Sequence, residues 1–346
     1  MRAFITGVAG ASLTAEERQF IREAQPWGLI VFARNIGDGA SLRRLVEEFR
    51  ATVGRKAPVL IDQEGGRVQR LRPPHCPVYP PGAVYGALYD RDPELGLRAA
   101  KLGARLIAAD LASFGIDVDC APLADVPAAG ADPIIGDRAY GTDPAKVAAI
   151  GGAIAAGLLE GGVLPVLKHI PGHGRASADS HEKLPVVNAD RATLETTDFA
   201  AFRPLATLPL GMTAHVVFTA FDPATPATSS ATIVDQVIRG SIGFQGLLMS
   251  DDVSMGALSG SLADRTTAAI AAGCDMVLHC NGKMAEMRAV AAAAPVLAGL
   301  AARRAEAALA ARKAAAPIDL AASRAAFADF MAVAGVPFGM PAPNSV

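Results

Sequence analysis

The stretch VLPVLKHIPGHGRASADSH, residues 163–181, is central to the fold prediction. Its apolar run, residues 163–167, is typical of a buried strand, and two polar residues, Lys168 and His169, end that run. Proline and glycine follow, so they prevent a helix and predict a loop that carries an aspartate and two more histidines. Ligands bind at the carboxyl ends of strands in α/β folds. This stretch is therefore a predicted functional site.

Outward from that stretch, short apolar runs bounded by turn residues recur. Eight of them are predicted strands, at residues 4–8, 28–32, 58–61, 116–120, 164–167, 212–216, 247–250 and 275–279. Helix-length amphipathic segments lie between most of them, at residues 42–53, 93–114, 144–160 and 194–205. Asp92-Pro93 and Asp143-Pro144 each place an N-cap before a proline at the first helical position. Alternating strands and helices predict a (β/α)8 barrel; a doubly wound sheet is the alternative, disfavoured because no GxGxxG is present.

The chain is expected to form a single barrel domain over residues 1–335. Its alanine-rich part, residues 284–330, is predicted to form two or three helices that close the structure, and residues 336–346 are expected to be a loose tail. A proline-rich stretch, residues 73–81, is the nearest candidate for a linker, but a loop between a strand and a helix explains it more simply.

Composition excludes several classes of protein. A net charge of -2 and a pI near 6.3 provide no basic field for nucleic acid or an anionic membrane. Apolar runs such as residues 147–159 fall short of the roughly 18 residues of a membrane span, and no signal peptide is evident. The cysteines have unrelated spacings, which indicates reduced thiols in a cytoplasmic protein: Cys76, Cys120, Cys274 and Cys280.

Polar residues follow several predicted strands and would converge on one face of a barrel. DQEGGRVQR (62–70) follows the third strand, and Asp119, Asp125 and GDR (136–138) follow the fourth. His215 follows the sixth strand, and SDD (250–252) ends the seventh.

A carboxylate at a strand end, such as Asp251, can attack an electrophilic carbon. Asp179 is close enough in sequence to His181 to set its tautomer and raise its basicity, which suits an acid/base group. Three cations are suited to binding the hydroxyl or carboxylate groups of a polar substrate: Arg70, Arg138 and Lys168. This set suits a retaining glycosidase, although the acid/base partner there is usually a second carboxylate. Taken alone, Asp251 is equally consistent with a loop acid or a helix cap.

Four ordered motifs resemble those of the bacterial β-N-acetylglucosaminidases of glycoside hydrolase family 3. They are DQEGGRVQR (62–70), KHIPGHG (168–174), DSH (179–181) and SDDVSM (250–255), and the similarity runs over residues 28–280. Members of this length are single barrels, without the second domain that supplies the acid/base residue in longer members.

The resemblance implies a double displacement with Asp251 as the nucleophile and His181, paired with Asp179, as the acid/base. It implies that N-acetylglucosamine is bound by Asp62, Arg70, Arg138, Lys168 and His169. The implied substrate is a muropeptide in which N-acetylglucosamine is β-1,4-linked to 1,6-anhydro-N-acetylmuramic acid, met in the cytoplasm during cell-wall recycling. No cofactor, metal, nucleic acid or membrane partner is implied, and the protein is expected to be a monomer.

Three other functions remain open from the residues alone. A metal-dependent hydrolase would use as ligands His169, His173, His181, His215 and Asp251, but Pro171 and Gly172 break the helix on which an HxxxH pair normally converges. A sensor on the same fold would bind the sugar without turning it over. A dehydrogenase is disfavoured by the missing dinucleotide fingerprint.

Overall fold

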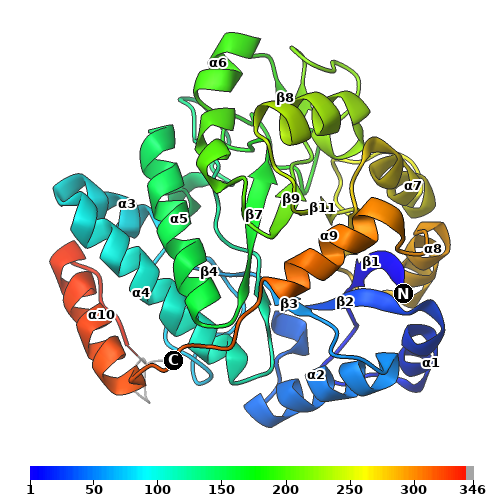
Figure 1. Cartoon of the computed structure of the whole chain (residues 1–346), viewed down its shortest axis with the longest axis horizontal. Helices are drawn as coiled ribbons and strands as arrows, with labels where there is room; N and C mark the ends of the chain where they lie inside the picture. The colour runs from blue at the N-terminus through cyan, green and yellow to red at the C-terminus, as the bar shows by residue number, and fades with distance from the viewer. Residues whose placement is uncertain (340–346) are drawn as a thin grey trace.

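A closed barrel of eight parallel strands forms the centre of the computed structural model, which describes residues 1–339 (Figure 1). Around the barrel the order is β1-β12-β11-β9-β7-β6-β3-β2. The strands are β1 (Arg2–Thr6), β2 (Pro26–Val31), β3 (Val59–Ile61), β6 (Val118–Asp119), β7 (Leu164–Ile170), β9 (Leu210–Thr213), β11 (Leu247–Asp252) and β12 (Met276–His279). The predicted α/β barrel is therefore confirmed.

Helices surround the barrel, and the last three of them follow the final strand. They are α1 (Ala15–Ala24), α2 (Gly39–Val53), α3 (Gly82–Arg91), α4 (Pro93–Ala112), α5 (Pro144–Glu160), α6 (Arg191–Thr196), α7 (Leu262–Ala272), α8 (Met284–Ala293), α9 (Gly299–Ala310) and α10 (Leu320–Ala334). Asp92 and Asp143 cap α4 and α5 as predicted, because their carboxylates accept backbone N–H groups of the first turn. Two small sheets lie outside the barrel: an antiparallel hairpin of β4 (Gln63–Gly65) and β5 (Val68–Gln69), and a parallel pair of β8 (Val186–Val187) and β10 (Val217–Phe218).

Two details of the prediction were wrong. The helix expected at residues 194–205 is α6 followed by two 3₁₀ turns, Phe199–Ala201 and Arg203–Leu205, and Pro204 has no N–H with which to continue a helix. The strand expected at residues 212–216 is β9, which ends at Thr213. His215 lies beyond it with both ring nitrogens hydrogen-bonded, to the Thr228 hydroxyl (2.7 Å) and the Asp252 carbonyl (3.0 Å).

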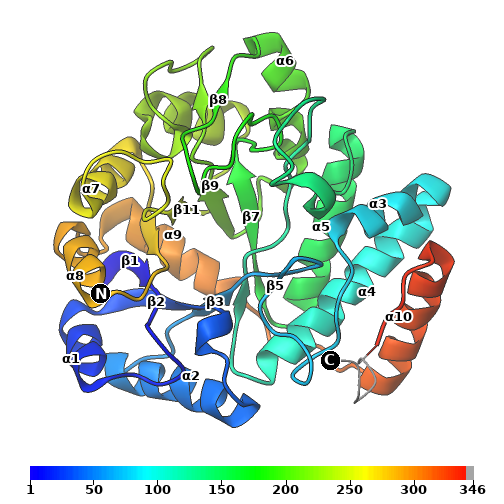
Figure 2. The same cartoon turned by 180° about the vertical axis from the view of Figure 1, so that it is seen from behind.

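The interior of the barrel is filled by side chains from every strand. These include Ile5, Ile30, Leu60, Val118, Val166, Met212, Met249 and Leu278. Ala305 and Ala308 of α9 belong to the same buried cluster, and their small side chains let the helix approach the barrel closely. Figure 1 shows α9 crossing one end of the barrel, and Figure 2, the view from behind, shows the β4–β5 hairpin at the opposite end. The end closed by α9 is the amino-terminal one, so the carboxyl ends of the strands remain available for a site.

The C-terminal helix α10 packs against α4 on the outside of the barrel (Figure 1). Phe327 is fully buried there, with its ring centroid 6.1 Å from that of Tyr79. The Tyr79 hydroxyl donates to Asp110 (2.6 Å), and Arg324 of α10 donates to the same carboxylate (2.7 Å). Tyr79 also donates its backbone N–H to Gln69 of the β4–β5 hairpin (2.9 Å). The helix is thus connected to the segment that carries the DQEGGRVQR motif.

The alanine-rich region forms three helices, α8, α9 and α10, as expected. Of the tail predicted at residues 336–346, residues 340–346 lie outside the described part. No helix within residues 1–339 combines the length and apolar character needed to cross a membrane. All four cysteines are buried and free.

Replacing Phe327 with alanine is expected to lower the free energy of unfolding by about 3–5 kcal/mol, the range for truncating a buried phenylalanine. Urea unfolding measures the loss. Leu320→Ala on the same helix is the control, because Leu320 is exposed and should change stability by about 0.5 kcal/mol or less. Equal effects of the two substitutions would mean that α10 does not pack as described.

Candidate active site

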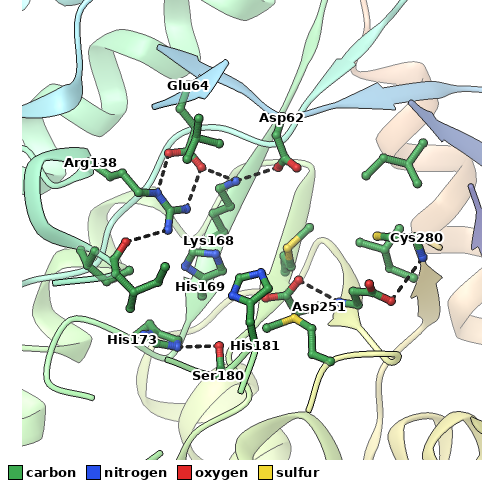
Figure 3. Close-up of a pocket in the computed structure, with 18 of the residues that line it drawn as sticks. Asp62, Glu64, Arg138, Lys168, His169, His173, Ser180, His181, Asp251 and Cys280 are labelled. Atoms are coloured by element: carbon green, nitrogen blue, oxygen red, sulfur yellow. Dashed lines mark hydrogen bonds and ion pairs between the residues drawn. The ribbon is translucent and has the colours of Figure 1, made fainter. Parts of the chain in front are cut away.

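A cavity of about 270 Å³ opens at the carboxyl ends of the barrel strands (Figure 3). This volume is near the lower end of the roughly 300–1,000 Å³ typical of small-molecule sites. Seven of the eight predicted site residues line it: Asp62, Arg70, Arg138, Lys168, His169, His181 and Asp251. The eighth, Asp179, contacts His181. The barrel thus brings together residues from β7 and β11, Asp62 directly after β3, and residues of the loops that follow β5, β6 and β7.

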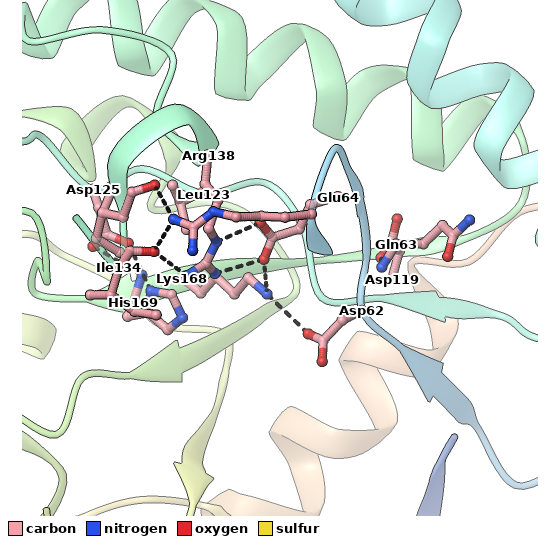
Figure 4. Close-up of polar contacts among 12 residues, drawn as sticks. Asp62, Gln63, Glu64, Asp119, Leu123, Asp125, Ile134, Arg138, Lys168 and His169 are labelled. Atoms are coloured by element: carbon pink, nitrogen blue, oxygen red, sulfur yellow. Dashed lines mark hydrogen bonds and ion pairs between the residues drawn. The ribbon is translucent and has the colours of Figure 1, made fainter. Parts of the chain in front are cut away.

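One wall of the cavity is an ion network centred on Lys168 (Figure 4). Its ammonium group is 3.0 Å from an Asp62 oxygen and 2.6 Å from a Glu64 oxygen. Arg138 donates two hydrogen bonds to Glu64, at 2.9 and 2.8 Å, and Arg70 donates one to Asp62 at 3.0 Å. Three cations and two carboxylates are therefore held in one connected arrangement.

The network keeps its members charged. Burial alone would raise the pKa of Glu64, but Arg138 and Lys168 outweigh it and lower that pKa to about 2. Burial likewise opposes ionisation of Asp62, yet Lys168 and Arg70 hold its pKa well below the ordinary value. The pKa of Lys168 is raised, because its two carboxylate partners outweigh its desolvation. These groups present fixed charges to a ligand at any physiological pH.

Asp251 lies at the end of β11, with one carboxylate oxygen accepting the N–H of Asp252 (2.8 Å). Burial disfavours its charged form, but His169, His215 and the Asp252 N–H favour that form and hold the pKa of Asp251 below its ordinary value. The neighbouring carboxylate of Asp252 has both oxygens engaged in hydrogen bonds, because it accepts from Ser254 and from the N–H of Cys280. Asp251 is thus an ionised carboxylate facing the cavity.

His181 reaches the cavity from the loop after β7. Its Nδ1 donates to Asp179 at 2.8 Å, and its backbone N–H donates to the same oxygen at 2.8 Å. Burial of Asp179 would raise its pKa, but these two hydrogen bonds and the imidazole lower it below the ordinary value. The bond to Asp179 orients the ring and leaves Nε2 as the nitrogen available to a ligand. Figure 3 shows the ring beside Asp251.

A second carboxylate–histidine unit contributes His169 and His173 to the cavity lining and is centred on the buried carboxylate of Asp125. Asp125 accepts from the Nδ1–H of His169 (2.7 Å) with one oxygen and from the backbone N–H of His173 (2.6 Å) with the other. His169 and the His173 N–H hold the pKa of Asp125 below its ordinary value against the effect of burial. Burial, with His169 adding to it, lowers the pKa of His173 to about 4, so this imidazole is neutral at pH 7.

Sequence reasoning did not assign three residues of this site: Glu64, Asp125 and Ser180. Glu64 and Asp125 each follow a predicted strand, which was the available signal, but their partners are distant in sequence. Arg138 is 74 residues from Glu64, and His169 is 44 residues from Asp125. Ser180 is the middle residue of the DSH motif, where no role of its own was predicted for it, and it lines the cavity.

The family model described as "Glycosyl hydrolase family 3 N terminal domain" matches residues 5–311. The chain belongs to glycosyl hydrolase family 3. As a family 3 member it is a glycoside hydrolase, which confirms the expectation from the four motifs. The roles of the individual residues stay predictions.

Named relatives of this family 3 chain agree with that membership. A β-hexosaminidase of Alkalilimnicola ehrlichii is 41% identical over 281 residues, which are 80% of this chain and 79% of that protein. The structure of NagZ from Neisseria gonorrhoeae in complex with N-trifluoroacetyl-D-glucosamine is similar with a TM-score of 0.81, at 30% identity and over 96% of both chains. A family 3 β-N-acetylglucosaminidase of Paenibacillus sp. str. FPU-7 gives a TM-score of 0.82 at 29% identity, over 92% of this chain and 63% of that one.

The ligand set of a metal-dependent hydrolase is not assembled in the part of this family 3 chain that the structure describes. Within residues 1–339, no three histidine, cysteine, aspartate or glutamate side chains are arranged to hold a metal ion. Of the five ligands considered, His169 and His181 each bond a carboxylate through Nδ1, and His215 uses both ring nitrogens.

Lys168→Met is expected to lower the free energy of unfolding by about 3–5 kcal/mol, because it removes a buried cation shared by two mostly buried carboxylates. Lys101→Met is the matched control, since it breaks a half-exposed pair with Glu160 and should cost about 1 kcal/mol or less. Guanidinium unfolding of both variants makes the comparison. A loss no larger for Lys168 than for Lys101 would show that the network does not depend on the lysine.

Proposed function

We propose that this chain is a retaining exo-β-N-acetylglucosaminidase acting on muropeptides in the cytoplasm. It would remove terminal N-acetylglucosamine that is β-1,4-linked to 1,6-anhydro-N-acetylmuramic acid. The observation that carries the proposal is that Asp251 and His181, the latter oriented by Asp179, face one small cavity. The sugar is supported by the β-hexosaminidase name of the relative and by the N-trifluoroacetyl-D-glucosamine bound to NagZ.

In the first step, an Asp251 oxygen attacks the anomeric carbon and the glycosidic carbon–oxygen bond breaks. The leaving oxygen takes the proton of His181 Nε2. The lowered pKa of Asp251 keeps this carboxylate ionised and able to attack. The carboxylate of Asp179 stabilises the protonated imidazole before transfer and fixes which nitrogen faces the sugar.

In the second step, neutral His181 accepts a proton from water as the water oxygen bonds the anomeric carbon, and Asp251 departs. Two displacements at one carbon give net retention of configuration. The group must donate and then accept a proton near neutral pH, which an imidazole with an ordinary pKa of about 6.5 does without burial. The side chain of His181 is 65% exposed, so a leaving group or a water can reach its ring.

The ion network would hold the terminal sugar. Lys168, Arg138 and Arg70 offer donors to hydroxyl and acetamido oxygens, while Asp62 and Glu64 can accept from hydroxyl groups. Their mutual bonds preorganise these groups before a sugar arrives, which reduces the ordering needed on binding. A small cavity with such a wall suits a single terminal residue, and hence exo action. A small carbohydrate or muropeptide substrate and a monomeric protein are part of the proposal.

The first test is release of 4-nitrophenol from 4-nitrophenyl N-acetyl-β-glucosaminide by the intact protein, with and without EDTA, and by Asp251→Ala. Turnover should survive the chelator and fall to near background in the variant, because the proposed mechanism forms the glycosyl-enzyme on the Asp251 carboxylate. Loss of turnover with EDTA would favour the metal-dependent alternative. No turnover by the intact protein would favour a sensor or a different sugar.

The second test addresses His181. His181→Ala should slow turnover of substrates with poor leaving groups by roughly two to four orders of magnitude, the usual range for a general acid/base. Cleavage of a 2,4-dinitrophenyl glycoside should slow much less in the glycosylation step, because that leaving group needs no proton. The measurement is kcat/KM across aryl N-acetyl-β-glucosaminides. A uniform loss across leaving groups would remove His181 from this role.

A further inference from the structure

The loop that carries His181 is attached to the loop that follows the strand of Asp251. Ser180 accepts the N–H of Ala257 at 3.1 Å through its backbone carbonyl, and His181 accepts the N–H of Gly256 at 3.2 Å in the same way. Two consecutive backbone hydrogen bonds therefore join the segments bearing the two groups that the proposed mechanism requires to cooperate.

A third bond holds the same loop to the barrel. The hydroxyl of Ser180 is 3.0 Å from Nε2 of His173, and both side chains are buried (Figure 3). The backbone N–H of His173 donates to Asp125, which also accepts from the His169 ring. A chain of hydrogen bonds thus runs from β7 through Asp125 and His173 to the serine immediately before His181.

The close approach of the two loops requires a glycine at position 256. A β-carbon there would lie 2.7 Å from the carbonyl oxygen of His181 and 2.8 Å from that of Glu182. A methyl group would push these carbonyls away, and the imidazole of His181 would move with its backbone. Position 256 therefore requires a glycine because the loop that carries His181 packs directly against it.

We propose that Ser180 and Gly256 are positioning residues that set the place of the His181 imidazole relative to Asp251. The proposal rests on the proposed function, in which His181 is the acid/base. Ser180 acts through its bond to His173, and Gly256 acts by admitting the loop. Because proton transfer requires hydrogen-bond contact with the leaving oxygen, a small displacement of His181 weakens protonation while leaving attack by Asp251 unchanged.

The experiment measures kcat and KM for Ser180→Ala and Gly256→Ala over aryl N-acetyl-β-glucosaminides whose phenols differ in acidity. For the phenyl glycoside, kcat/KM should fall roughly three- to tenfold, the scale set by one neutral hydrogen bond. For the 2,4-dinitrophenyl glycoside it should fall less than twofold. Ser177→Ala is the matched control, since Ser177 is an exposed serine of the same loop and should give unchanged values with both.

Hydrogen exchange supplies a readout of position that is independent of turnover. In Ser180→Ala, the amides of Gly256 and Ala257 should exchange faster than in the intact protein, because the loop carrying their acceptors is held by one bond fewer. In Ser177→Ala their exchange should be unchanged. A loss of folded protein would lower kcat equally for every phenol, so it cannot imitate a change in leaving-group dependence.

Two outcomes overturn the proposal. Equal losses for phenyl and 2,4-dinitrophenyl glycosides would mean that the substituted residue serves the sugar or the fold. Unchanged kcat/KM in both Ser180→Ala and Gly256→Ala would mean that neither residue positions His181. Failure of the positioning role can be told apart from failure of the proposed function, because His181→Ala is measured in the same experiment. If His181→Ala itself shows no leaving-group dependence, the acid/base assignment fails; if it does and Ser180→Ala matches Ser177→Ala, only the positioning role fails.

Discussion

The buried ammonium group of Lys168, shared between Asp62 and Glu64, is the interaction on which the rest of the site depends. It joins β7 to the segment after β3, and through Glu64 it joins both to Arg138 in the loop after β6. Without this cation, these two mostly buried carboxylates would each carry a large desolvation cost. The barrel must therefore close with these strand ends in register, so the fold and the binding wall form as one unit.

The site separates a wall of fixed charges from a histidine on an exposed loop. The wall around Lys168 is buried and held ionised by its own ion pairs, so it can bind but cannot exchange protons near neutral pH. His181 is exposed on a loop, and Asp179 fixes the orientation of its ring. Asp251 lies between these two environments, ionised by its neighbours yet open to the cavity. The proposed double displacement would use this division between binding, attack and proton transfer.

The two ends of the barrel have different tasks. At the amino-terminal end, α9 covers the strands with small alanines and completes the apolar interior. At the carboxyl end, the loops after β7 and β11 meet through backbone hydrogen bonds and the buried pair of Ser180 and His173. The apolar interior is thus covered at the amino-terminal end, while the carboxyl end brings Asp251 and His181 to one cavity.

The sequence by itself determined the eight strands, because short apolar runs bounded by turn residues are local signals. It also determined the Asp179–His181 pair, whose members are two residues apart. The end of β9 at Thr213 was not evident, since strand pairing overrides an apolar pattern. The interrupted helix after α6 did have a sequence signal in Pro204, which has no N–H with which to continue a helix. Only the tertiary structure decided that Glu64 pairs with Arg138 and Asp125 with His169. The physical reason is that a sequence pattern encodes which face a residue occupies, whereas barrel closure decides which distant residues share that face.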